Sequence, residues 1–538
     1  MVFARRSTTL LAAIIASCAM VLSLTACTSD NKTVVDGQTT VTSNSAGGVA
    51  VFTPSDGITL NQQVPLNKWA KLVPDLTKAL VDAGFKKGDI NHTTSDSLDK
   101  QSRAIQDFVV DHLSNNTTDD SGIAIAPDNM TLLVAPVVEA DASTRQYGDY
   151  VSQNLSTNDV TDEGATSDGE SSEDDSSNTE SDSTASDEQA QAVDRLVSSL
   201  KLAKESGMHV VLLGNSIEGY KPDAFVKFSD AQTIGKLQAE KMVSKLKLDK
   251  ASKDNPKYIE VLLPYTAVDE KGNANDSTFA QEAFRGIWQV LGSYYQKGVV
   301  ESPSGTLDGK STENDWQAVA YDAAKEGSTA KVLDKRLAKT DGQSTLTRID
   351  GIITMNDYIA SEVVKELDDL GYTGSAADIN PQITISGIVG NITGKKDLSR
   401  DAVPDPIKSP ENDNANDSSS SDDDADKDTS ASDKDRDSQW PLVTGYGAYV
   451  SNIPSIVNGK QWMTGMEDRQ TIATDIAQAC AKLNKDEALN SMPSIRNSEV
   501  GGVKKIPTIS EPLLAVSAGN LKSALIDPGY ISLADAGL

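Results

Sequence analysis

The sequence has little cysteine, little histidine and few aromatic residues. Its 538 residues include three cysteines and three histidines, and aromatic residues make up 5% of the chain. The histidines, His92, His112 and His209, lie in different predicted elements, so neither a zinc cluster nor a Ser-His-Asp set is indicated. The sequence also contains no strong match to a glycine-rich phosphate-binding loop. We therefore expect a protein that is not an enzyme, with no catalytic residues, no metal site and no cofactor.

Long apolar runs are absent after the N-terminal region, so the sequence predicts no membrane-spanning helix. Arg5 and Arg6 precede the apolar run Leu10–Leu24, which is the arrangement of an export signal. The run ends in Leu-Thr-Ala-Cys27, which resembles the lipobox of bacterial lipoproteins. This resemblance implies that residues 1–26 are removed and that Cys27 carries a diacylglyceryl lipid, which holds the chain at the outer face of the cell membrane. A chance cysteine in an ordinary secreted protein is the alternative.

Basic side chains are outnumbered, with 49 Lys and Arg against 79 Asp and Glu, for a formal net charge of -30. The excess is local, because Val151–Ala190 holds 12 acidic and no basic residues and Glu411–Asp437 holds 11 acidic and three basic residues. Such stretches are typical of solvated surface loops without a fixed conformation, which we place at 157–188 and 409–438. The acidic charge argues against a nucleic-acid partner.

Strand and helix patterns alternate along the chain, which predicts an α/β fold with right-handed crossovers and parallel sheets. The first series is strand Val49–Phe52, helix Leu66–Ala83, strand Asp89–Asn91, a helix around Ile105–His112, strand Gly122–Asp128, helix Met130–Ala140, helix Ala190–Ser206 and strand His209–Leu213. Helix Thr233–Leu246 ends the first series. The second series opens with strand Tyr258–Leu263 and continues with helices Phe279–Tyr295 and Trp316–Glu326 and strands Ile349–Met355 and Gln382–Gly387. Helix Thr471–Leu483 follows in the tail of the chain.

Two series of this kind indicate two lobes of similar architecture, with a boundary near Leu248–Pro256. The predicted divisions are a flexible tether at 27–48, lobe 1 at 49–250 with a return segment at about 466–500, and lobe 2 at 251–465 with a tail at about 505–538. Cys480 is expected to be a small apolar residue on helix Thr471–Leu483.

The stretch Gly351–Leu370 predicts a strand, a polar turn and a helix in succession. Ligands of parallel sheets lie outside the carboxyl ends of the strands, where a helix N-terminus offers free backbone N–H groups. Asn356 and Asp357 would therefore lie at the mouth of a crevice. The alternative is that Asp357 only caps the helix.

An ordered series of short motifs resembles the xylose-binding and multiple-sugar-binding proteins, which are type I periplasmic binding proteins of ABC importers. The motifs are Lys68-Trp69, Gly122–Asp128, Asp230 with Gly235–Ala239, Asn273–Asp276, Asn356-Asp357, Gly459–Gln461 with Met463-Thr464, and Ala515–Asn520 followed by Asp527–Ile531. The resemblance covers nearly all of the chain from Val49 onward, apart from the acidic stretches. It implies two Rossmann-like lobes, joined by three crossing strands, that close on a monosaccharide.

The resemblance also implies a set of ligand-binding residues, which would supply flat apolar faces and planar hydrogen-bonding groups to a sugar. They are Lys68, Trp69, Asn215, Asn275, Asp276, Trp316, Asn356, Asp357 and Gln461. Simpler roles remain open: core packing for Trp69, turn residues for Asn275 and Asp276, and a hinge residue for Gln461.

Three charged groups of the family pattern are missing or displaced. Asn215-Ser216 stands where an Arg is usual, Phe284 stands at a second Arg position, and Ile388-Val389 replaces a carboxylate. Arg285 could restore the second position through a one-residue gap, or it could be a surface residue of its helix. Hydrogen bonds to charged groups contribute about 1.5–3 kcal/mol each, so the ligand or its affinity is expected to differ from that of an ordinary sugar-binding protein.

The first functional hypothesis is therefore a monomeric, lipid-anchored solute receptor that delivers a sugar-like ligand to an ABC permease. The second is a ligand-sensing or interaction lipoprotein with the same fold and a diverged cleft, which the acidic stretches favour. A secreted hydrolase with paired carboxylates is a third possibility that no pattern marks.

Overall fold

The computed structural model divides the chain into two units, Met1–Asn44 and Ser45–Leu538. It describes residues 34–35, 38–39, 46–55, 65–115, 129–138, 144–151, 153–156, 180–268, 275–323, 325–338, 346–376 and 439–538. In the first unit, the described strands β1 (Val34–Val35) and β2 (Gln38–Thr39) pair in antiparallel fashion. Several predictions lie outside the described residues: the signal at 1–26, the lipid at Cys27, strands Gly122–Asp128 and Gln382–Gly387, and the acidic stretch 409–438.

A seven-stranded sheet organises the part of the second unit that we call lobe 1. Its strand order is β17-β18-β9-β7-β5-β3-β4, and β17 alone pairs in antiparallel fashion. The strands are β3 (Gly48–Pro54), β4 (Ile90–Ser95), β5 (Met130–Val134), β7 (His209–Leu213), β9 (Ala224–Lys227), β17 (Ile495–Val500) and β18 (Val503–Ser510). The central strands are buried almost throughout, as their continuous apolar sequences require in a sheet covered on both faces.

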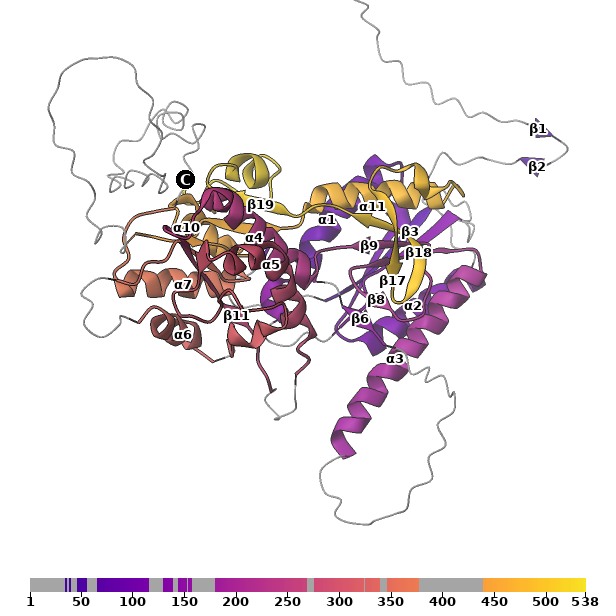
Figure 1. Ribbon diagram of the computed structural model, residues 1–538. Coiled ribbons are helices and arrows are strands. Elements are labelled where there is room, and N and C mark those ends of the chain that lie inside the picture. The colour runs from indigo at the N-terminus through magenta and orange to yellow at the C-terminus, as the bar shows by residue number, and fades with distance from the viewer. Residues whose placement is uncertain are drawn as a thin grey trace, which may run out of the picture. The chain divides into compact units, whose positions relative to one another are not determined.

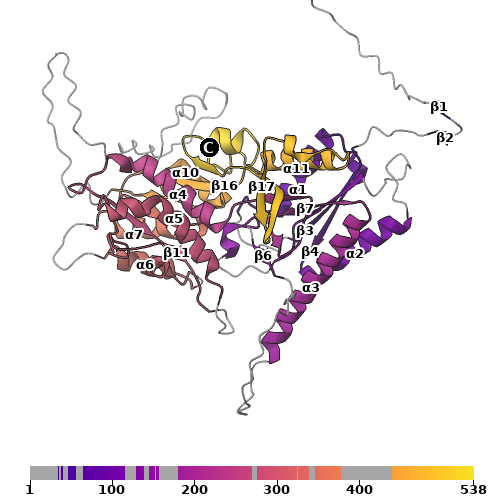
Figure 2. The ribbon, with the colours of Figure 1, turned by 45° about the vertical axis from the view of Figure 1, so that its right-hand side comes forward.

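Helices cover both faces of this sheet. Helices α1 (Trp69–Asp82) and α11 (Arg469–Leu483) pack together on one face, although almost 400 residues separate them (Figure 1). Apolar side chains at three-to-four spacing on α1 face the core, which explains why this sequence forms a helix here. Helices α2 (Leu98–Asn115) and α3 (Glu180–Glu205) pack on the other face. Figure 2 shows the long helix α3 from a second direction.

A four-stranded parallel sheet organises lobe 2, with the strand order β12-β10-β14-β15. The strands are β10 (Lys257–Val261), β12 (Val300–Glu301), β14 (Gly351–Ile353) and β15 (Leu442–Val443), and β11 (Leu263–Pro264) pairs with β13 (Ala320–Tyr321) beyond them. Helices α4 (Ala231–Leu246) and α5 (Thr278–Gln296) contribute to one core cluster, and α6 (Ser328–Arg336) and α7 (Asp357–Leu370) contribute to another.

The chain passes between the lobes three times, at residues 228–230, 467–468 and 511–513. Strands β16 (Met463–Met466) and β19 (Leu514–Ser517), which flank the second and third crossings, pair in antiparallel fashion. The predicted α/β fold, with two sheets of mostly parallel strands, is confirmed. The chain crosses between the lobes three times as predicted, but the residues that cross are not strands.

Short elements complete the second unit. They are η1 (Lys87–Asp89), η3 (Thr144–Tyr147), β6 (Asn154–Leu155), β8 (Ser216–Ile217), η4 (Leu248–Lys250), η5 (Asp315–Ala318), η6 (Val450–Asn452), α10 (Ile453–Val457), η7 (Leu489–Ser491) and η8 (Lys522–Ile526). Among the described helices, none has the length and apolar character that crossing a membrane requires.

Two predicted helices are wrong. Met130–Val134, the start of the predicted helix Met130–Ala140, is the central strand β5, because its uninterrupted apolar sequence is buried on both faces of the sheet. The predicted helix Trp316–Glu326 is the single turn η5 followed by strand β13.

Two predicted boundaries also differ from those in the structure. Helix α3 begins at Glu180, inside the acidic stretch that was expected to be a loop up to Glu188. Helix α4 packs in the core of lobe 2, so the chain leaves lobe 1 before this helix and not near Leu248–Pro256.

Candidate ligand-binding cleft

The carboxyl ends of strands from both sheets come together between the lobes. In lobe 1 the strand order reverses at β3, because β4 lies on one side of it and β5 on the other. In lobe 2 it reverses in the same way at β10, which lies between β12 and β14. Such switch points are where α/β sheets bind ligands. The residues that follow β5, β7, β14 and β15 are joined by hydrogen bonds in this region.

The centre of this region is occupied by the chain itself. We use the name cleft segment for Thr144–Leu155, in which residue 152 is outside the described residues. It contains η3 and β6 and follows strand β5 in the chain. Strand β6 pairs in parallel with β8, which lies just beyond the carboxyl end of β7. The cleft segment is therefore attached to the edge of the lobe 1 sheet where a ligand is expected.

Lobe 1 contacts the cleft segment through the start of helix α1. The Nζ atom of Lys68 lies 2.8 Å from Oδ1 of Asp149, and the backbone N–H of Trp69 donates to Oδ2 of the same carboxylate at 3.0 Å. The indole of Trp69 is 2% exposed and meets the ring of Tyr150 edge-on, with centroids 5.1 Å apart. Tyr150 also stacks on Phe228 at 4.8 Å. Trp69 is thus a buried side chain whose aromatic partner comes from the cleft segment.

Asn215, which follows β7, holds the other end of the cleft segment. Its Oδ1 accepts from the backbone N–H of Gln153 at 3.0 Å, and its Nδ2 donates to the carbonyl of Pro136 at 2.9 Å. The side chain is buried, so both polar atoms of this amide are satisfied by the protein.

Lobe 2 contacts the cleft segment through the turns that follow β14 and β15. Nδ2 of Asn356 donates to Oε1 of Gln146 at 3.1 Å, and the hydroxyl of Tyr449 donates to the carbonyl of Gln146 at 2.7 Å. The ring of Tyr147 lies 4.7 Å from that of Phe279. Asn356 also caps helix α7, because its Oδ1 accepts from the backbone N–H of Ile359.

Asp357 lies behind Asn356 in a buried polar network. Its Oδ1 accepts from Nε2 of Gln461 at 2.7 Å, and its Oδ2 accepts from the Thr464 hydroxyl and the Tyr449 backbone N–H, each at 2.9 Å. Burial raises the pKa of Asp357 to about 6, although these hydrogen bonds act in the opposite direction. A Cβ atom on Gly445 would lie 2.1 Å from Oδ1 of Asp357, so the network requires glycine there. Within the described residues, the side chains of Asp357 and Gln461 are hydrogen-bonded to each other and to other groups of lobe 2, among them the Thr464 hydroxyl and Nδ2 of Asn452.

The three remaining predicted residues lie in lobe 2. Trp316 is 8% exposed and packs edge-on against Tyr265, with centroids 5.1 Å apart. Asn275 donates from Nδ2 to the carbonyl of Thr266, which fixes the loop before helix α5. Asp276 is exposed and accepts from the N–H and the hydroxyl of Thr278, as turn residues do.

Arg285 forms an ion pair with Glu282, one turn earlier on helix α5. Both side chains are about one third exposed. This arrangement fits the surface role that was left open for Arg285.

A second buried carboxylate joins two of the crossings. Oε1 of Glu467 accepts from the backbone N–H of Ser229 at 2.7 Å and from the Tyr446 hydroxyl at 3.3 Å. The Ser229 and Tyr446 hydroxyls are also hydrogen-bonded to each other. Burial raises the pKa of Glu467 to about 7.

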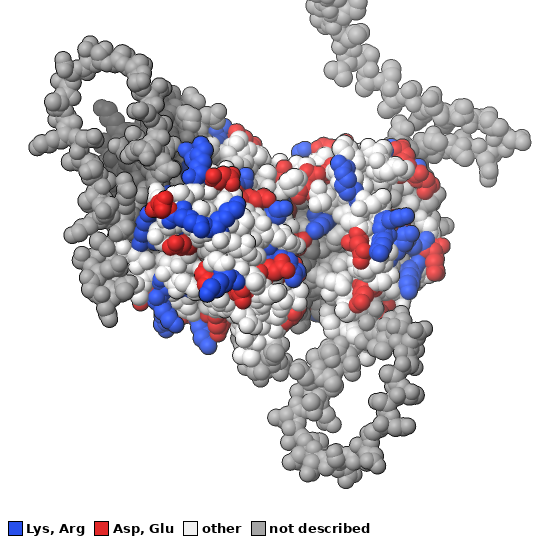
Figure 3. Space-filling view, in the orientation of Figure 1, with Lys and Arg blue, Asp and Glu red and all other residues white. Residues whose placement is uncertain are grey.

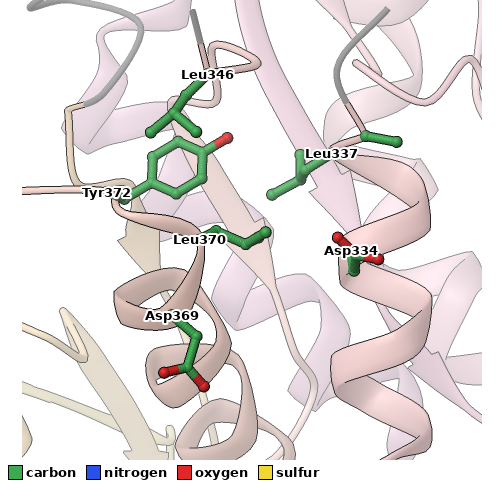
Figure 4. Close-up of a pocket in the computed structure, with 7 residues that line it drawn as sticks. Asp334, Leu337, Leu346, Asp369, Leu370 and Tyr372 are labelled. Carbon is green, nitrogen blue, oxygen red and sulfur yellow. The ribbon is translucent and has the colours of Figure 1, made fainter.

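Two cavities in the described part of the chain are lined by none of the nine predicted residues, although the second lies next to Asn215. One of about 390 Å³ lies between helices α6 and α7, lined by Asp334, Leu337, Ala338, Leu346, Asp369, Leu370 and Tyr372 (Figure 4). The other, of about 280 Å³, lies beside β7 and β9 and is lined in part by Gln153 and Asn154 of the cleft segment.

Within the described ranges, no cluster of three or more His, Cys, Asp or Glu side chains could hold a metal ion. On the face shown in Figure 3, acidic and basic side chains are interspersed over both lobes.

Several residues at the cleft were missed by sequence reasoning, chiefly Gln146, Asp149 and Tyr150 of the cleft segment and the buried Asn67 before helix α1. The carbonyl of Asn67 accepts from the backbone N–H of Asp149 at 2.8 Å. The available signal was the run Arg-Gln-Tyr-Gly-Asp-Tyr150, because two tyrosines in six residues are unusual in a chain with 5% aromatic residues.

Comparison with known proteins gave structural matches only. No protein-family model matches the sequence, and no curated protein does. Among solved structures, an ABC transporter solute-binding protein from Clostridium phytofermentans with bound β-D-glucose is 17% identical, with 91% of this chain and 99% of that chain covered and a TM-score of 0.44. A carbohydrate transporter solute-binding protein from Chloroflexus aurantiacus in complex with D-glucose is also 17% identical, with 92% and 98% covered and a TM-score of 0.44. A periplasmic ribose ABC transporter protein from Conexibacter woesei is 13% identical, with 90% and 96% covered and a TM-score of 0.43.

With TM-scores below 0.5 and identities below 25%, these likenesses do not establish a family or a ligand for this chain. The fold assignment rests on the strand orders and the three crossings.

Proposed function

We propose that the chain is an extracytoplasmic binding protein of the type I class, which takes a small polyhydroxylated solute between its lobes and delivers it to an ABC permease. The observation that supports this proposal most is the arrangement of the cleft. The carboxyl ends of two parallel sheets with the same order reversal meet there, and they carry the amides of Asn215 and Asn356 and the ammonium of Lys68. Closure of the lobes on the solute would follow from its contacts with both of them.

Membrane attachment through a lipid on Cys27 is a part of this proposal that rests on the sequence alone. Replacement of Cys27 by Ser is expected to prevent lipidation and to release the protein from the membrane fraction into the soluble extracytoplasmic fraction. A Cys27→Ser variant that stays in the membrane fraction would refute the anchor without affecting the proposed solute binding.

Intrinsic tryptophan fluorescence tests solute binding, because Trp69 contacts the cleft segment directly. We expect saturable changes with at least one member of a panel of D-xylose, D-ribose, D-glucose and D-glucuronate. A Trp69→Phe variant should lose most of the signal, and a Trp440→Phe variant should keep it, because Trp440 lies against Lys460 in a core cluster of lobe 2 to which the cleft segment does not contribute. No response to any panel member, confirmed by calorimetry, would refute a sugar ligand.

A second candidate function is a sensing or interaction lipoprotein. It is favoured by one observation, that the polar groups of the cleft already bind the protein's own chain. Neighbouring genes for a permease and an ATPase would support import, whereas a neighbouring histidine kinase gene would support sensing.

A further inference from the structure

The cleft segment binds residues that the resemblance to sugar-binding proteins implies for a solute. Four of the nine predicted ligand-binding residues bind it: Lys68 and Trp69 through Asp149, Asn215 through Gln153, and Asn356 through Gln146. We propose that the cleft segment is a tethered competitor, which fills the cleft of the unliganded protein and must leave before a solute can bind. This inference rests on the proposed function only in requiring that the cleft accepts a solute.

The fit of the cleft segment against lobe 1 depends on a single glycine. Gly148 has φ +92°, and a Cβ atom there would lie 2.6 Å from the carbonyl oxygen of Asn67. That same carbonyl accepts the backbone N–H of Asp149 at 2.8 Å. A side chain at position 148 would therefore be strained in its backbone and would press against the hydrogen bond that fixes the segment.

Aromatic packing holds the cleft segment from both sides. Tyr150 contacts the rings of both Trp69 and Phe228, which also meet each other edge-on, and its hydroxyl donates to the carbonyl of Lys68. Tyr147 packs on Phe279 of lobe 2, and its side chain is 1% exposed. The Tyr150 ring thus stacks on Phe228 and the Tyr147 ring lies tilted on Phe279, so both tyrosines bury apolar ring surface that the C–H faces of a sugar ring could occupy instead.

The polar contacts of the cleft segment define what a displacing solute must offer. Asp149 supplies acceptors to the Lys68 ammonium and to the Trp69 backbone N–H, and Gln146 supplies an acceptor to Asn356. A solute that replaces the segment must present acceptors to the Trp69 N–H and the Asn356 amide in particular, because both residues are buried and a donor left there without a partner destabilises the complex. Hydroxyl and carboxylate oxygens share this chemistry, and D-glucose and D-glucuronate distinguish the two.

Competition by a tethered segment has a measurable consequence. The apparent dissociation constant equals the intrinsic one divided by the fraction of molecules whose cleft is empty. Weakening the docked state therefore tightens solute binding, whereas loss of an ordinary ligand contact would weaken it. A gain in solute affinity therefore indicates a competitor, and a loss of affinity indicates a segment that helps to hold the solute.

Hydrogen–deuterium exchange of the full chain, read in peptides that cover residues 144–155, tests the docked state without a ligand. We expect slow exchange in the wild type and faster exchange in a Gly148→Ala variant. The matched control is Gly371→Ala, because Gly371 also has φ +92° but a Cβ atom there would meet no other atom within 4 Å. Exchange of the 144–155 peptides in the wild type at the rate of an unstructured peptide would overturn the inference.

Calorimetric titration with the four sugars of the panel then tests the competition. Gly148→Ala is expected to bind the solute at least tenfold more tightly than the wild type, and Gly371→Ala is expected to bind it as the wild type does. Asp149→Asn, which keeps the backbone and the size of the side chain, should shift the affinity in the same direction by a smaller factor. Addition of solute to the wild type should speed exchange in the 144–155 peptides.

Equal dissociation constants for the wild type and both cleft-segment variants would overturn the competition while leaving the proposed function intact. The opposite failure is distinguishable. If the 144–155 peptides are protected and are released by Gly148→Ala, yet neither protein binds any panel member, then the proposed sugar binding fails and the segment is a fixed closure of the cleft.

Discussion

Stability should fall with rising pH because of Glu467, the carboxylate that joins two of the crossings. Its side chain is 1% exposed, and its hydrogen-bond donors are the Ser229 backbone N–H and the Tyr446 hydroxyl. Burial is the largest cause of the rise in its pKa, and the charge of Asp230 adds to it. The folded protein therefore holds the proton of this carboxyl more tightly than the unfolded chain does.

The magnitude follows from the two pKa values. The difference between the ordinary value of 4.5 and the folded value of about 7 corresponds to about 3 kcal/mol in the free energy of unfolding. Below pH 4.5 the carboxyl is protonated in both states and carries no penalty, and above pH 7 it is ionised in both states and the full penalty applies. Asp357, with a pKa of about 6 in the fold against an ordinary value of 3.8, acts in the same direction between those two pH values.

A Glu467→Gln variant isolates the first effect, because its amide oxygen can still accept both hydrogen bonds and carries no charge. We expect the variant and the wild type to have similar stability at about pH 4.5 and the variant to be about 3 kcal/mol more stable at about pH 8, a Tm difference of about 5 °C. Thermal unfolding by circular dichroism across this range is the assay, with Glu218→Gln, a change at an exposed position, as the control. A difference in Tm between Glu467→Gln and the wild type that stays the same over the whole pH range would refute this reasoning.

Two further substitutions test the buried contacts of lobe 2. Asp357→Ala should lower the free energy of unfolding by about 2–4 kcal/mol in urea titrations, because the Tyr449 backbone N–H and the Thr464 hydroxyl lose the carboxylate oxygen that accepts from both of them inside the lobe. A loss below about 0.5 kcal/mol would contradict the network. Gly286→Ala should lower the free energy of unfolding by about 1–3 kcal/mol, because a Cβ atom there would lie 2.0 Å from the Gln232 carbonyl and would force helices α4 and α5 apart. A Tm equal to that of the wild type would contradict this prediction, because it would mean that the two helices can move apart without loss of stability.

Much of the fold could be predicted because hydrophobic periodicity reports which face of an element is buried. Helix α1 was identified from the spacing of Trp69, Leu72, Leu76 and Leu80, and all four side chains are buried. The error at Met130–Ala140 has a physical cause, because a short continuous apolar run fits a strand buried on both faces as well as a buried helix. Periodicity alone cannot separate the two.

The positions around the cleft could be predicted in part, whereas their partners could not. Asn215 and Asn356 follow strands, and the rule for carboxyl ends of parallel strands placed Asn356 at a crevice, where both side chains bind the cleft segment. The partners come from the connection between β5 and α3, which carries the acidic stretch and no helical or strand periodicity near Gln146 and Asp149. Contacts between such a connection and distant turns depend on the path of the chain, which local sequence patterns do not encode.

The competition between solute and cleft segment also predicts which solutes the cleft selects. The segment supplies acceptors to the partly exposed Lys68, to the Trp69 backbone N–H and to Asn356. Trp69 and Asn356 are buried, so a solute that lacks the acceptor for either of them leaves a donor unpaired in a buried site. Each unpaired donor costs about 1–3 kcal/mol, which corresponds to a factor of about 5–150 in affinity. Since the segment is tethered and is always present at a high effective concentration, a solute with an incomplete set of acceptors loses to it even when its ring fits between the lobes. Deoxy sugars should therefore bind far more weakly than the parent sugar, and the difference should be visible in the same titrations.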